Sequence, residues 1–333
     1  MKNILVVRRD NIGDLVCTTP LISMLRKQYP KATIRLLACS YNAPVLEQND
    51  DLDEICTYVK AKHRGNRSLL SIYTERLKML WRLRREPIDL AILATPALDK
   101  HGLALAKQSG ARQIVGVDAA NLKISSPIAP STLDGLHQVE KSIRIAGLDI
   151  KHAPSLKLRC SETELIQAKN FLATYNVDSK TDKIAAFHIS ARKTCNQWSS
   201  QKFADLINQY QQKHKSPAAI FWSPGSKNDP KHPGDDEKLE ELLALLDSNY
   251  PIIPYRTENL RELMAGLSMM QLVVCSDGGA MHVASGLQRP VIAFFGYPGA
   301  PDWRPWGEHQ LIYREPLSDV STDTVLDAIS QYF

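Results

Sequence analysis

The chain has 333 residues, of which 44% are hydrophobic and 23% charged, with 16 glycines and 19 prolines. This length and composition indicate a globular protein of about two domains and exclude collagen-like, low-complexity and coiled-coil chains. The net charge of +5 suits an anionic ligand or a membrane surface, and is too small by itself to indicate nucleic-acid binding.

The sequence lacks the signals of a membrane-spanning or exported protein. No apolar run approaches the roughly 20 residues that cross a bilayer, and the four apolar residues after Asn3 are too few for a signal peptide. The six cysteines stand singly without a CxxC pair, which predicts reduced thiols and no zinc site. We therefore expect a cytoplasmic protein.

Apolar runs of strand length alternate with helical patterns along the whole chain. Because these runs are continuous, they are typical of parallel strands covered on both faces, and we predict an α/β protein with two doubly wound domains. In the first half the predicted strands are Asn3–Arg8, Thr33–Ala38, Ile55–Val59, Ile88–Thr95 and Gln113–Val117. In the second half they are Ile184–Ile189, Ala218–Trp222, Ile252–Tyr255, Leu272–Cys275 and Val291–Phe295.

The stretch Lys151–Glu162 contains Pro154 and has no helical period. It predicts a domain boundary, so that the domains cover residues 1–155 and 156–333, and the last helix is a candidate to pack back on the first domain. Domains of this class bind ligands at the carboxyl ends of their strands. Function is therefore expected in the loops that follow strands.

The loop after the first strand, RRDNIGDLVCTTP at residues 8–20, is rich in charge. It contains neither GxGxxG nor GK[ST], which excludes two common phosphate-binding loops. Gly13 allows a backbone shape that side chains forbid, or leaves room for a ligand. A helix begins either at Thr19-Pro20 or at Asp14.

Two aspartates of this loop lie near a helix N-terminus. For each of them the alternatives are a helix cap and a functional carboxylate. Asp10 fits a cap better, whereas Asp14 follows the glycine directly and is the candidate general base for an attacking hydroxyl.

The segment 60–85 is more basic than the rest of the chain. It interleaves apolar residues with cations, which predicts an amphipathic helix with a basic face. That face is either simply solvated, or contacts a phosphorylated acceptor or anionic lipid head groups. The cations are Lys60, Lys62, Arg64, Arg67, Arg76, Lys78, Arg82, Arg84 and Arg85.

The run LVVCSDGGAMHVASG at residues 272–286 predicts a buried strand, a turn and a helix. The two glycines, Gly278 and Gly279, let backbone N–H groups point at one place beside the helix N-terminus, which suits a diphosphate. Ser276 and Asp277 are candidates to bind a ribose or phosphate, and His282 to donate to the same anion. The alternative is a tight turn with a capping aspartate.

Three further loops follow strands. In FHISARKT, Ser190, Arg192 and Lys193 are candidates to bind the diphosphate, the alternative being exposed surface cations. Ser199 or Ser200 is expected to cap the next helix. The loop FFGYPGAPDWRPWG either covers the core or offers a flat wall for a sugar or base, and FWSPGSKNDP is a weaker candidate to border the nucleotide.

Taken together, these motifs resemble glycosyltransferase family 9, the bacterial lipopolysaccharide heptosyltransferases. The resemblance covers nearly the whole chain and is carried mainly by RRDNIGDLVCTTPLISMLR and SDGGAMHVASGLQRPVIAFFG, with WRPWG beyond. Weaker matches are FHISARKTCNQWSSQKFADLI and HQVEKSIRIAGLDI.

The resemblance implies a GT-B fold of two Rossmann-like domains facing a central cleft, with the acceptor on the N-terminal domain and the donor on the C-terminal one. It implies inverting transfer without a metal or cofactor, usually of heptose from an ADP-heptose to inner-core lipopolysaccharide at the cytoplasmic membrane face. Peripheral membrane contact would suit such a protein, and nucleic acid would not be a partner.

The resemblance also implies roles for individual residues. The family's catalytic aspartate falls on Asp14, and its donor-phosphate positions fall on Asp277, Gly278, Gly279 and His282. We further predict that the acceptor binds Arg8, Arg9, Asp10, Asn11 and Gly13.

Two positions depart from the family pattern. Many members have a donor-contacting lysine where this chain has Asn196, so Lys193 or Arg192 must substitute or the donor is handled differently. Many also have Thr or Ser at the position of Gly278. Two other functions stay open: a GT-B-type sugar-nucleotide epimerase, and a degenerate nucleotide-binding protein without transferase activity.

Overall fold

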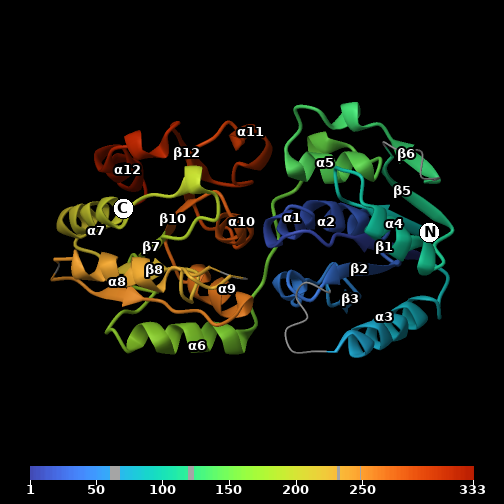
Figure 1. Cartoon of the computed structure of the whole chain (residues 1–333), viewed down its shortest axis with the longest axis horizontal. Coiled ribbons are helices and arrows are strands. Elements are labelled where there is room, and N and C mark those ends of the chain that lie inside the picture. The colour runs from blue at the N-terminus through green and yellow to red at the C-terminus, as the bar shows by residue number, and fades with distance from the viewer. Residues whose placement is uncertain (61–67, 119–123, 231–232, 248) are drawn as a thin grey trace. The chain divides into compact units, whose positions relative to one another are not determined.

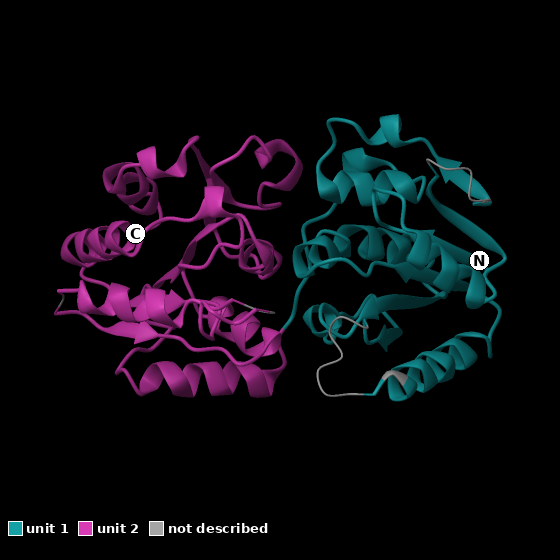
Figure 2. Ribbon diagram, in the orientation of Figure 1, with its two compact units in different colours: residues 1–159 teal, residues 160–333 magenta. Residues whose placement is uncertain are grey.

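The computed structural model describes residues 1–60, 68–118, 124–230, 233–247 and 249–333. The chain forms two compact units, residues 1–159 and 160–333 (Figure 2). Each unit is a parallel sheet with helices around it (Figure 1). The predicted α/β class is confirmed.

The first unit contains six strands in its described residues: β1 (Asn3–Val7), β2 (Thr33–Cys39), β3 (Glu54–Tyr58), β4 (Leu90–Leu93), β5 (Gln113–Val117) and β6 (Ser126–Ile128). Its α-helices are α1 (Ile12–Val16), α2 (Thr19–Gln28), α3 (Leu69–Leu83), α4 (Lys100–Gln108) and α5 (Gln138–Ile145). The strands are parallel and are ordered β3-β2-β1-β4-β5-β6, which is the order of a dinucleotide-binding Rossmann sheet.

The second unit repeats this plan. Its strands are β7 (Ala185–His188), β8 (Ala218–Phe221), β9 (Ile252–Pro254), β10 (Leu272–Ser276), β11 (Val291–Phe295) and β12 (His309–Tyr313). Its α-helices are α6 (Glu162–Ala173), α7 (Ser200–His214), α8 (Asp236–Ala244), α9 (Leu260–Ser268), α10 (Gly279–Gly286), α11 (Ala300–Trp303) and α12 (Thr322–Ile329). The order β9-β8-β7-β10-β11-β12 corresponds strand for strand to that of the first sheet.

The central strands are buried on both faces, which explains their continuous apolar runs. Leu5 and Val7 of β1 belong to a core cluster with Met79 and Leu83 of α3. Ile4 and Val6 point to the opposite face, because strand side chains alternate, and they are equally buried. All ten predicted strands are present.

Two strands were not predicted from the sequence, β6 and β12. Both lie at a sheet edge and have one neighbour each. Only Ile312 of β12 is buried, and β6 has no buried residue and contains Pro127. A strand that is solvated on most sides needs no apolar run, so neither one carries the pattern that identifies a buried strand.

The start of the second helix corrects one prediction. Thr18, and not Thr19, stands at the N-cap of α2, its side chain makes no capping hydrogen bond, and Pro20 occupies the first turn. A separate short helix, α1, precedes it, with Asn11 at its N-cap and Asp14 in its first turn. At α7 the prediction is confirmed, because the Ser199 side chain accepts from the Lys202 N–H.

The segment expected to link the domains is bound to the first unit. The Lys157 N–H donates to Thr19 Oγ1 at 3.1 Å, and the Lys157 carbonyl accepts from Asn49 Nδ2 at 3.3 Å. Lys157 Nζ also lies 2.9 Å from Asp51 Oδ2. These contacts explain why the first unit extends to Arg159, four residues beyond the predicted end at 155. The last helix, α12, belongs to the second unit and packs against α7.

An ion pair joins α6 to α9 within the second unit. Arg261 Nε and Nη2 lie 2.7 and 2.6 Å from the two carboxylate oxygens of Glu164. These hydrogen bonds hold the pKa of Glu164 at about 2, below its ordinary value of 4.5. The pair therefore stabilises the fold fully above the ordinary value, and loses this contribution as the pH falls toward 2.

We expect Glu164→Gln to lower the free energy of unfolding by about 1–2 kcal/mol at neutral pH. The difference from wild type should shrink between pH 4.5 and about 2, because the wild-type carboxylate is then protonated. Urea unfolding at a series of pH values measures this. A difference that stays constant across the series would mean that the charge of Glu164 is not its origin.

None of the helices in the described ranges combines the length and apolarity that crossing a bilayer requires.

Candidate active site

The candidate residues gather at one place in each sheet. In the first unit the order of strand addition reverses between the neighbours β1 and β4, and in the second between β7 and β10. Open parallel sheets bind ligands at the carboxyl ends of the strands at such a reversal. The predicted residues of the first unit follow β1, and those of the second lie at or after the ends of β7 and β10.

In the first unit the loop is organised around Arg8, which is only 1% exposed. Its Nη2 donates to Asp14 Oδ1 at 2.6 Å, and its Nε lies 3.3 Å from Asp10 Oδ2. Nη1 donates to the Ala94 carbonyl at the end of β4. Arg8 was expected to bind the acceptor. Because its guanidinium is buried against two carboxylates and a carbonyl, its place in the structure is that of a positioning residue.

Both carboxylate oxygens of Asp14 are held. Oδ1 accepts from Arg8, and Oδ2 accepts from the backbone N–H of Asn11 at 3.1 Å and from its Nδ2 at 3.0 Å. The Asp14 side chain keeps 12% of its surface exposed. Asp14 thus has the capping position that was one alternative, and its carboxylate is fixed in a side chain that remains slightly exposed. Gly13 beside it is a buried helical residue of α1, so its presence is not explained by an unusual backbone conformation.

The side chains of Asp10 and Arg9 bind to other side chains and not to the N-terminus of a helix. Thr95 Oγ1 donates to Asp10 Oδ2 at 3.2 Å, so Asp10 is not the cap that the sequence favoured. Burial raises the pKa of Asp10, and Arg8 offsets this in part. Arg9 is half-buried: its Nε lies 3.2 Å from Asp99 Oδ2, and its Nη1 donates to the Tyr58 hydroxyl at 3.1 Å.

In the second unit Asp277 is the centre of the loop network. Its Oδ2 accepts from the Tyr297 hydroxyl at 2.8 Å and from Asn196 Nδ2 at 3.4 Å, and lies 3.5 Å from Lys193 Nζ. Asp277 was expected to bind the donor directly. A carboxylate repels a phosphate, so these contacts suit a positioning role better than a direct phosphate contact.

Asn196, which stands where many family members have a lysine, is completely buried. Its Oδ1 accepts from the Gly296 N–H at 2.9 Å, and its backbone carbonyl accepts from Ser276 Oγ at 2.6 Å. The loops after β7, β10 and β11 are thereby joined. Ser276, predicted to contact the donor, is 5% exposed and its hydroxyl serves this junction.

Of the two predicted cations, Lys193 and Arg192, only Lys193 joins this network. Its ammonium lies 3.7 Å from the centre of the Tyr297 ring, in addition to its contact with Asp277, and its side chain is 52% exposed. Arg192 is exposed and pairs with no carboxylate among the described residues. Among the described residues, Lys193 is therefore the one of these two cations that lies against Asp277.

The N-terminus of α10 lies beside this ammonium, because Gly278 and Gly279 follow Asp277 directly and both are exposed. The backbone of Gly278 is extended (φ 171°), and a Cβ added there would meet no atom closer than 3.9 Å. A Ser or Thr, as in many family members, would fit. His282, predicted to donate to the same anion, is 2% exposed and packs edge-on against Trp303, 5.8 Å between ring centres.

Ser190 connects the loop after β7 to its surroundings, and His188 lies just before that loop. Ser190 Oγ accepts from the Ser223 N–H at 2.8 Å, which links it to the loop after β8. Burial lowers the pKa of His188, the last residue of β7, to about 4, so this imidazole is neutral at pH 7. In the tryptophan-containing loop, Arg304 stacks over Trp306 at 5.5 Å.

Sequence reasoning missed four members of these networks: Thr95, Asp99, Tyr58 and Tyr297. Tyr297 follows the end of β11 by two residues and Thr95 follows β4 by two, so both obey the rule that pointed to the other loops. Asp99 is the N-cap of α4. Their partners lie far away in the chain, and no local pattern indicates them.

The described part of the chain contains no group of three His, Cys, Asp or Glu side chains placed to hold a metal ion.

Comparison with known proteins adds independent information. The chain is 24% identical over 317 residues to lipopolysaccharide heptosyltransferase 3 of Escherichia coli K12, covering 89% of this chain and 83% of the relative. Among solved structures, a glycosyl transferase family 9 protein from Veillonella parvula superposes with a TM-score of 0.85 at 19% identity, covering 99% and 97% of the chains. The E. coli heptosyltransferase WaaC with ADP gives 0.75 at 17% identity, covering 99% and 100%.

These likenesses confirm the GT-B fold class. The family model for glycosyltransferase family 9 (heptosyltransferase) matches residues 76–328. The matched range contains the Asn196, Asp277 and α10 loops and leaves out the first loop, so the interpretation of Asp14 depends on the geometry described above and on the resemblance of residues 8–26. The chain belongs to glycosyltransferase family 9 and is a glycosyltransferase.

Proposed function

We propose that this protein transfers a heptose from ADP-heptose, or a closely related nucleotide sugar, to the core of a lipopolysaccharide-type acceptor, with inversion and without a metal. Family membership supports glycosyl transfer. The relative from E. coli K12 is a lipopolysaccharide heptosyltransferase, and a solved neighbour was crystallised with ADP-2-deoxy-2-fluoro heptose. These names suggest the sugar, the nucleotide and the acceptor.

The observation that carries the proposal is the position of Asp14. A carboxylate at the carboxyl end of β1, fixed by Arg8 and Asn11 and still partly exposed, is suited to accept a proton from an acceptor hydroxyl. As the proton moves to Asp14, the hydroxyl oxygen bonds to the anomeric carbon. The bond from that carbon to the donor phosphate breaks, and the nucleoside diphosphate leaves.

In this proposal, groups of the second unit stabilise the negative charge of the leaving diphosphate. The start of α10, where Gly278 and Gly279 are exposed, and the Lys193 ammonium, which lies 3.5 Å from Asp277 Oδ2, both supply positive charge for this purpose. Asp277 and Tyr297 hold Lys193 from one side, and Asn196 holds Asp277. In this proposal Asn196 is a positioning residue, and the cation comes from three residues earlier in the chain.

The experiment that tests the function mixes the purified protein with a heptose-deficient core oligosaccharide and, separately, ADP-heptose, UDP-sugars and GDP-sugars. We expect nucleoside diphosphate release and a heptose-sized mass gain of the acceptor with ADP-heptose, undiminished by EDTA. Thermal unfolding with each donor gives a second readout of binding. Transfer from another nucleotide sugar, or loss of transfer in EDTA, would overturn the corresponding part of the proposal.

The two rival functions are separated by the same assay. A sugar-nucleotide epimerase converts its donor without an acceptor, and the family match favours a transferase instead. A degenerate nucleotide-binding protein would be stabilised by ADP-heptose and would release no ADP with any acceptor.

A further inference from the structure

Helix α3 has two apolar faces, and only one of them is used by the fold. Met79, Leu80 and Leu83 are buried in the core cluster of the first unit, and Ile72 is also buried. On the outer side, large apolar side chains remain exposed to a considerable fraction: Leu70 (74%), Tyr73 (57%), Leu77 (65%) and Trp81 (60%). At 3.6 residues per turn these four fall within roughly 80° of the helix circumference.

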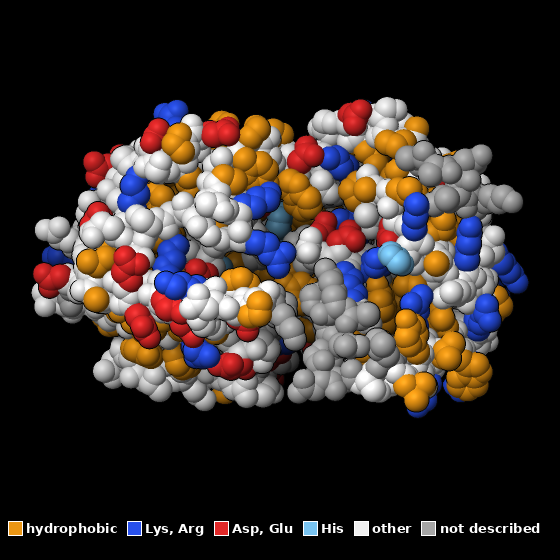
Figure 3. All heavy atoms as spheres, viewed as in Figure 1, with side chains coloured by type: hydrophobic (Ala, Val, Ile, Leu, Met, Phe, Trp, Pro, Cys, Tyr) orange, Lys and Arg blue, Asp and Glu red, His pale blue; other side chains and the backbone are white. Residues whose placement is uncertain are grey.

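This outer stripe, Leu70-Tyr73-Leu77-Trp81, is unusual for the molecule. Among the described residues, ten large hydrophobic side chains are exposed, and four of these ten lie in the stripe. Exposed apolar side chains scattered singly are normal, whereas a contiguous set marks an interaction surface. In the space-filling view, hydrophobic and basic side chains gather at the lower right, where Figure 1 places α3 (Figure 3).

Cations border the stripe on both sides. On the helical wheel Arg76 lies along one edge of the stripe and Lys78 along the other, and Arg84 and Arg85 follow directly at the end of the helix. The Arg85 guanidinium lies 4.0 Å from the centre of the Trp81 ring. Residues 68–85 contain five Lys and Arg residues and one acidic residue, Glu75. Arg82 is paired with Glu54, with Arg82 Nη2 3.0 Å from Glu54 Oε1.

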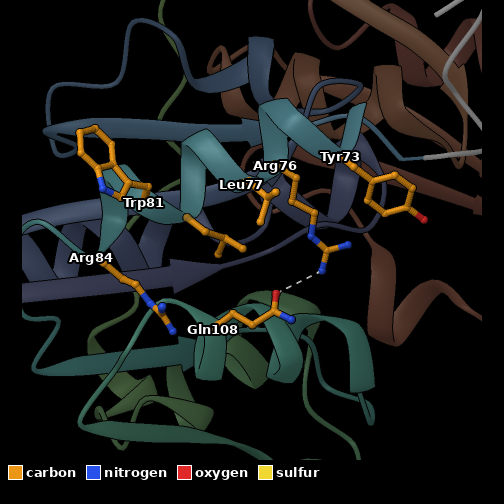
Figure 4. Close-up of a pocket in the computed structure, with 7 residues that line it drawn as sticks. Tyr73, Arg76, Leu77, Trp81, Arg84 and Gln108 are labelled. Carbon is orange, nitrogen blue, oxygen red and sulfur yellow. Dashed lines mark hydrogen bonds between the residues drawn. The ribbon is translucent and has the colours of Figure 1, made fainter. Parts of the chain in front are cut away.

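A pocket of about 610 Å³ opens beside the stripe, between α3 and the end of α4 (Figure 4). Leu77, Leu80 and Trp81 supply apolar lining, and the guanidinium groups of Arg76 and Arg84 point into the space. Gln108 holds Arg76 from the α4 side, with Arg76 Nη2 3.4 Å from Gln108 Oε1. An apolar hollow with two cations at its rim suits an anionic head group and the first methylenes of its chain.

We propose that this face of α3 docks the enzyme on a bilayer that contains anionic phospholipid, with Leu77 and Trp81 inserted at the level of the head groups. An apolar stripe flanked by Lys and Arg is the pattern of a helix that lies in a membrane interface. A second copy of the chain is a poorer occupant, because pairing two such faces would bring their cations together. Lys62, Arg64 and Arg67, which belong to the same basic segment, lie outside the described residues.

The biological purpose of this docking rests on the proposed function. A lipid-anchored acceptor is found at the membrane, so an enzyme docked there reaches its acceptor by diffusion along the membrane surface. The binding itself can be measured without donor or acceptor. Failure of docking and failure of heptosyl transfer are therefore distinguishable.

The experiment measures cosedimentation of the full chain with vesicles of phosphatidylcholine alone, and of phosphatidylcholine mixed with phosphatidylglycerol. We expect binding to the mixed vesicles only, and release by salt, since the attraction is screened. Leu77→Glu and the double variant Arg84→Gln/Arg85→Gln should each lower the partition coefficient at least tenfold, as roughly expected for losing an apolar anchor or two cations.

Matched controls come from the second unit. Ile166 on α6 is 52% exposed, so Ile166→Glu introduces the same charge at a similar apolar site. Lys169→Gln/Lys180→Gln removes two exposed cations. Both controls should bind as wild type does, and all variants should keep the wild-type melting temperature and transfer activity on a delipidated core oligosaccharide.

Three outcomes would overturn the proposal. They are equal binding to both kinds of vesicle, unchanged binding of Leu77→Glu, and a lipid-free dimer in light scattering that Leu77→Glu dissociates, which would assign the face to a second copy.

Discussion

Replacing Asp14 with asparagine is expected to lower the turnover number by roughly 10²- to 10⁴-fold, the range in which a general base contributes. The amide is nearly isosteric, and its oxygen can still accept from Arg8 or from Asn11. It cannot take up the proton of an acceptor hydroxyl. Donor affinity should change little, because the proposed donor groups belong to the second unit. Initial rates with ADP-heptose and core oligosaccharide, together with calorimetric titration of ADP, provide the two measurements.

A matched control is available at the opposite end of the same sheet. Asp53 also pairs with an arginine, Arg26, and accepts from the Ile34 N–H at the start of β2. Asp53→Asn removes an arginine-paired carboxylate far from the loop after β1, and should cost stability without a comparable loss of turnover. Wild-type rates in Asp14→Asn would show that Asp14 is not the base, and a lowered melting temperature beside them would assign it to helix capping alone.

Replacing Lys193 with alanine is expected to weaken donor binding by roughly ten- to hundredfold, because a charge-assisted hydrogen bond to a phosphate is lost. The fold should survive, since more than half of the Lys193 side chain surface is exposed, and its ammonium lies against the Asp277 carboxylate and the Tyr297 ring. Titration with ADP and with adenosine separates the phosphate contribution. The loss should appear with ADP and be absent with adenosine.

Arg192→Ala is the matched control for Lys193→Ala. It removes an equal charge from the neighbouring exposed position, where no carboxylate of the described residues holds it. We expect a much smaller change in ADP affinity. If Arg192→Ala weakened ADP binding as strongly as Lys193→Ala or more so, the cation that replaces the family's lysine would be Arg192, and the network around Asp277 would be purely structural.

Several features of the molecule follow from local sequence alone. The run Ile4-Leu5-Val6-Val7 is typical of a strand covered on both faces, and with nine other runs of the same kind it predicts ten of the twelve described strands. Ser199 caps α7 because its side chain reaches an N–H three residues away. The placement of Asp14 at a strand end beside a helix start is equally local. Such features depend on neighbours within a few residues, where backbone propensity and side-chain periodicity act.

Other features depend on contacts between residues far apart in the chain. Arg8 looks like a substrate-binding cation in the sequence, and becomes a buried positioning residue because β4 brings the Ala94 carbonyl to it. In the sequence, Asn196 looks like the loss of a donor-binding lysine. In the structure, its hydrogen bonds join the loops after β7, β10 and β11, because these strands are neighbours. The edge strands β6 and β12 are defined by their pairing with β5 and β11 and not by an apolar run of their own.

The chain's apolar periodicity thus determined its fold class and the loops in which chemistry is found, because a strand or helix must bury a face of matching period. Which charged groups in those loops are buried and which remain exposed was determined only when the sheets assembled. Arg8, Lys193, Asn196 and Asp277 find their partners on segments that lie up to about a hundred residues away in the chain. These pairs form because a polar group that is buried without a hydrogen-bond partner destabilises the fold.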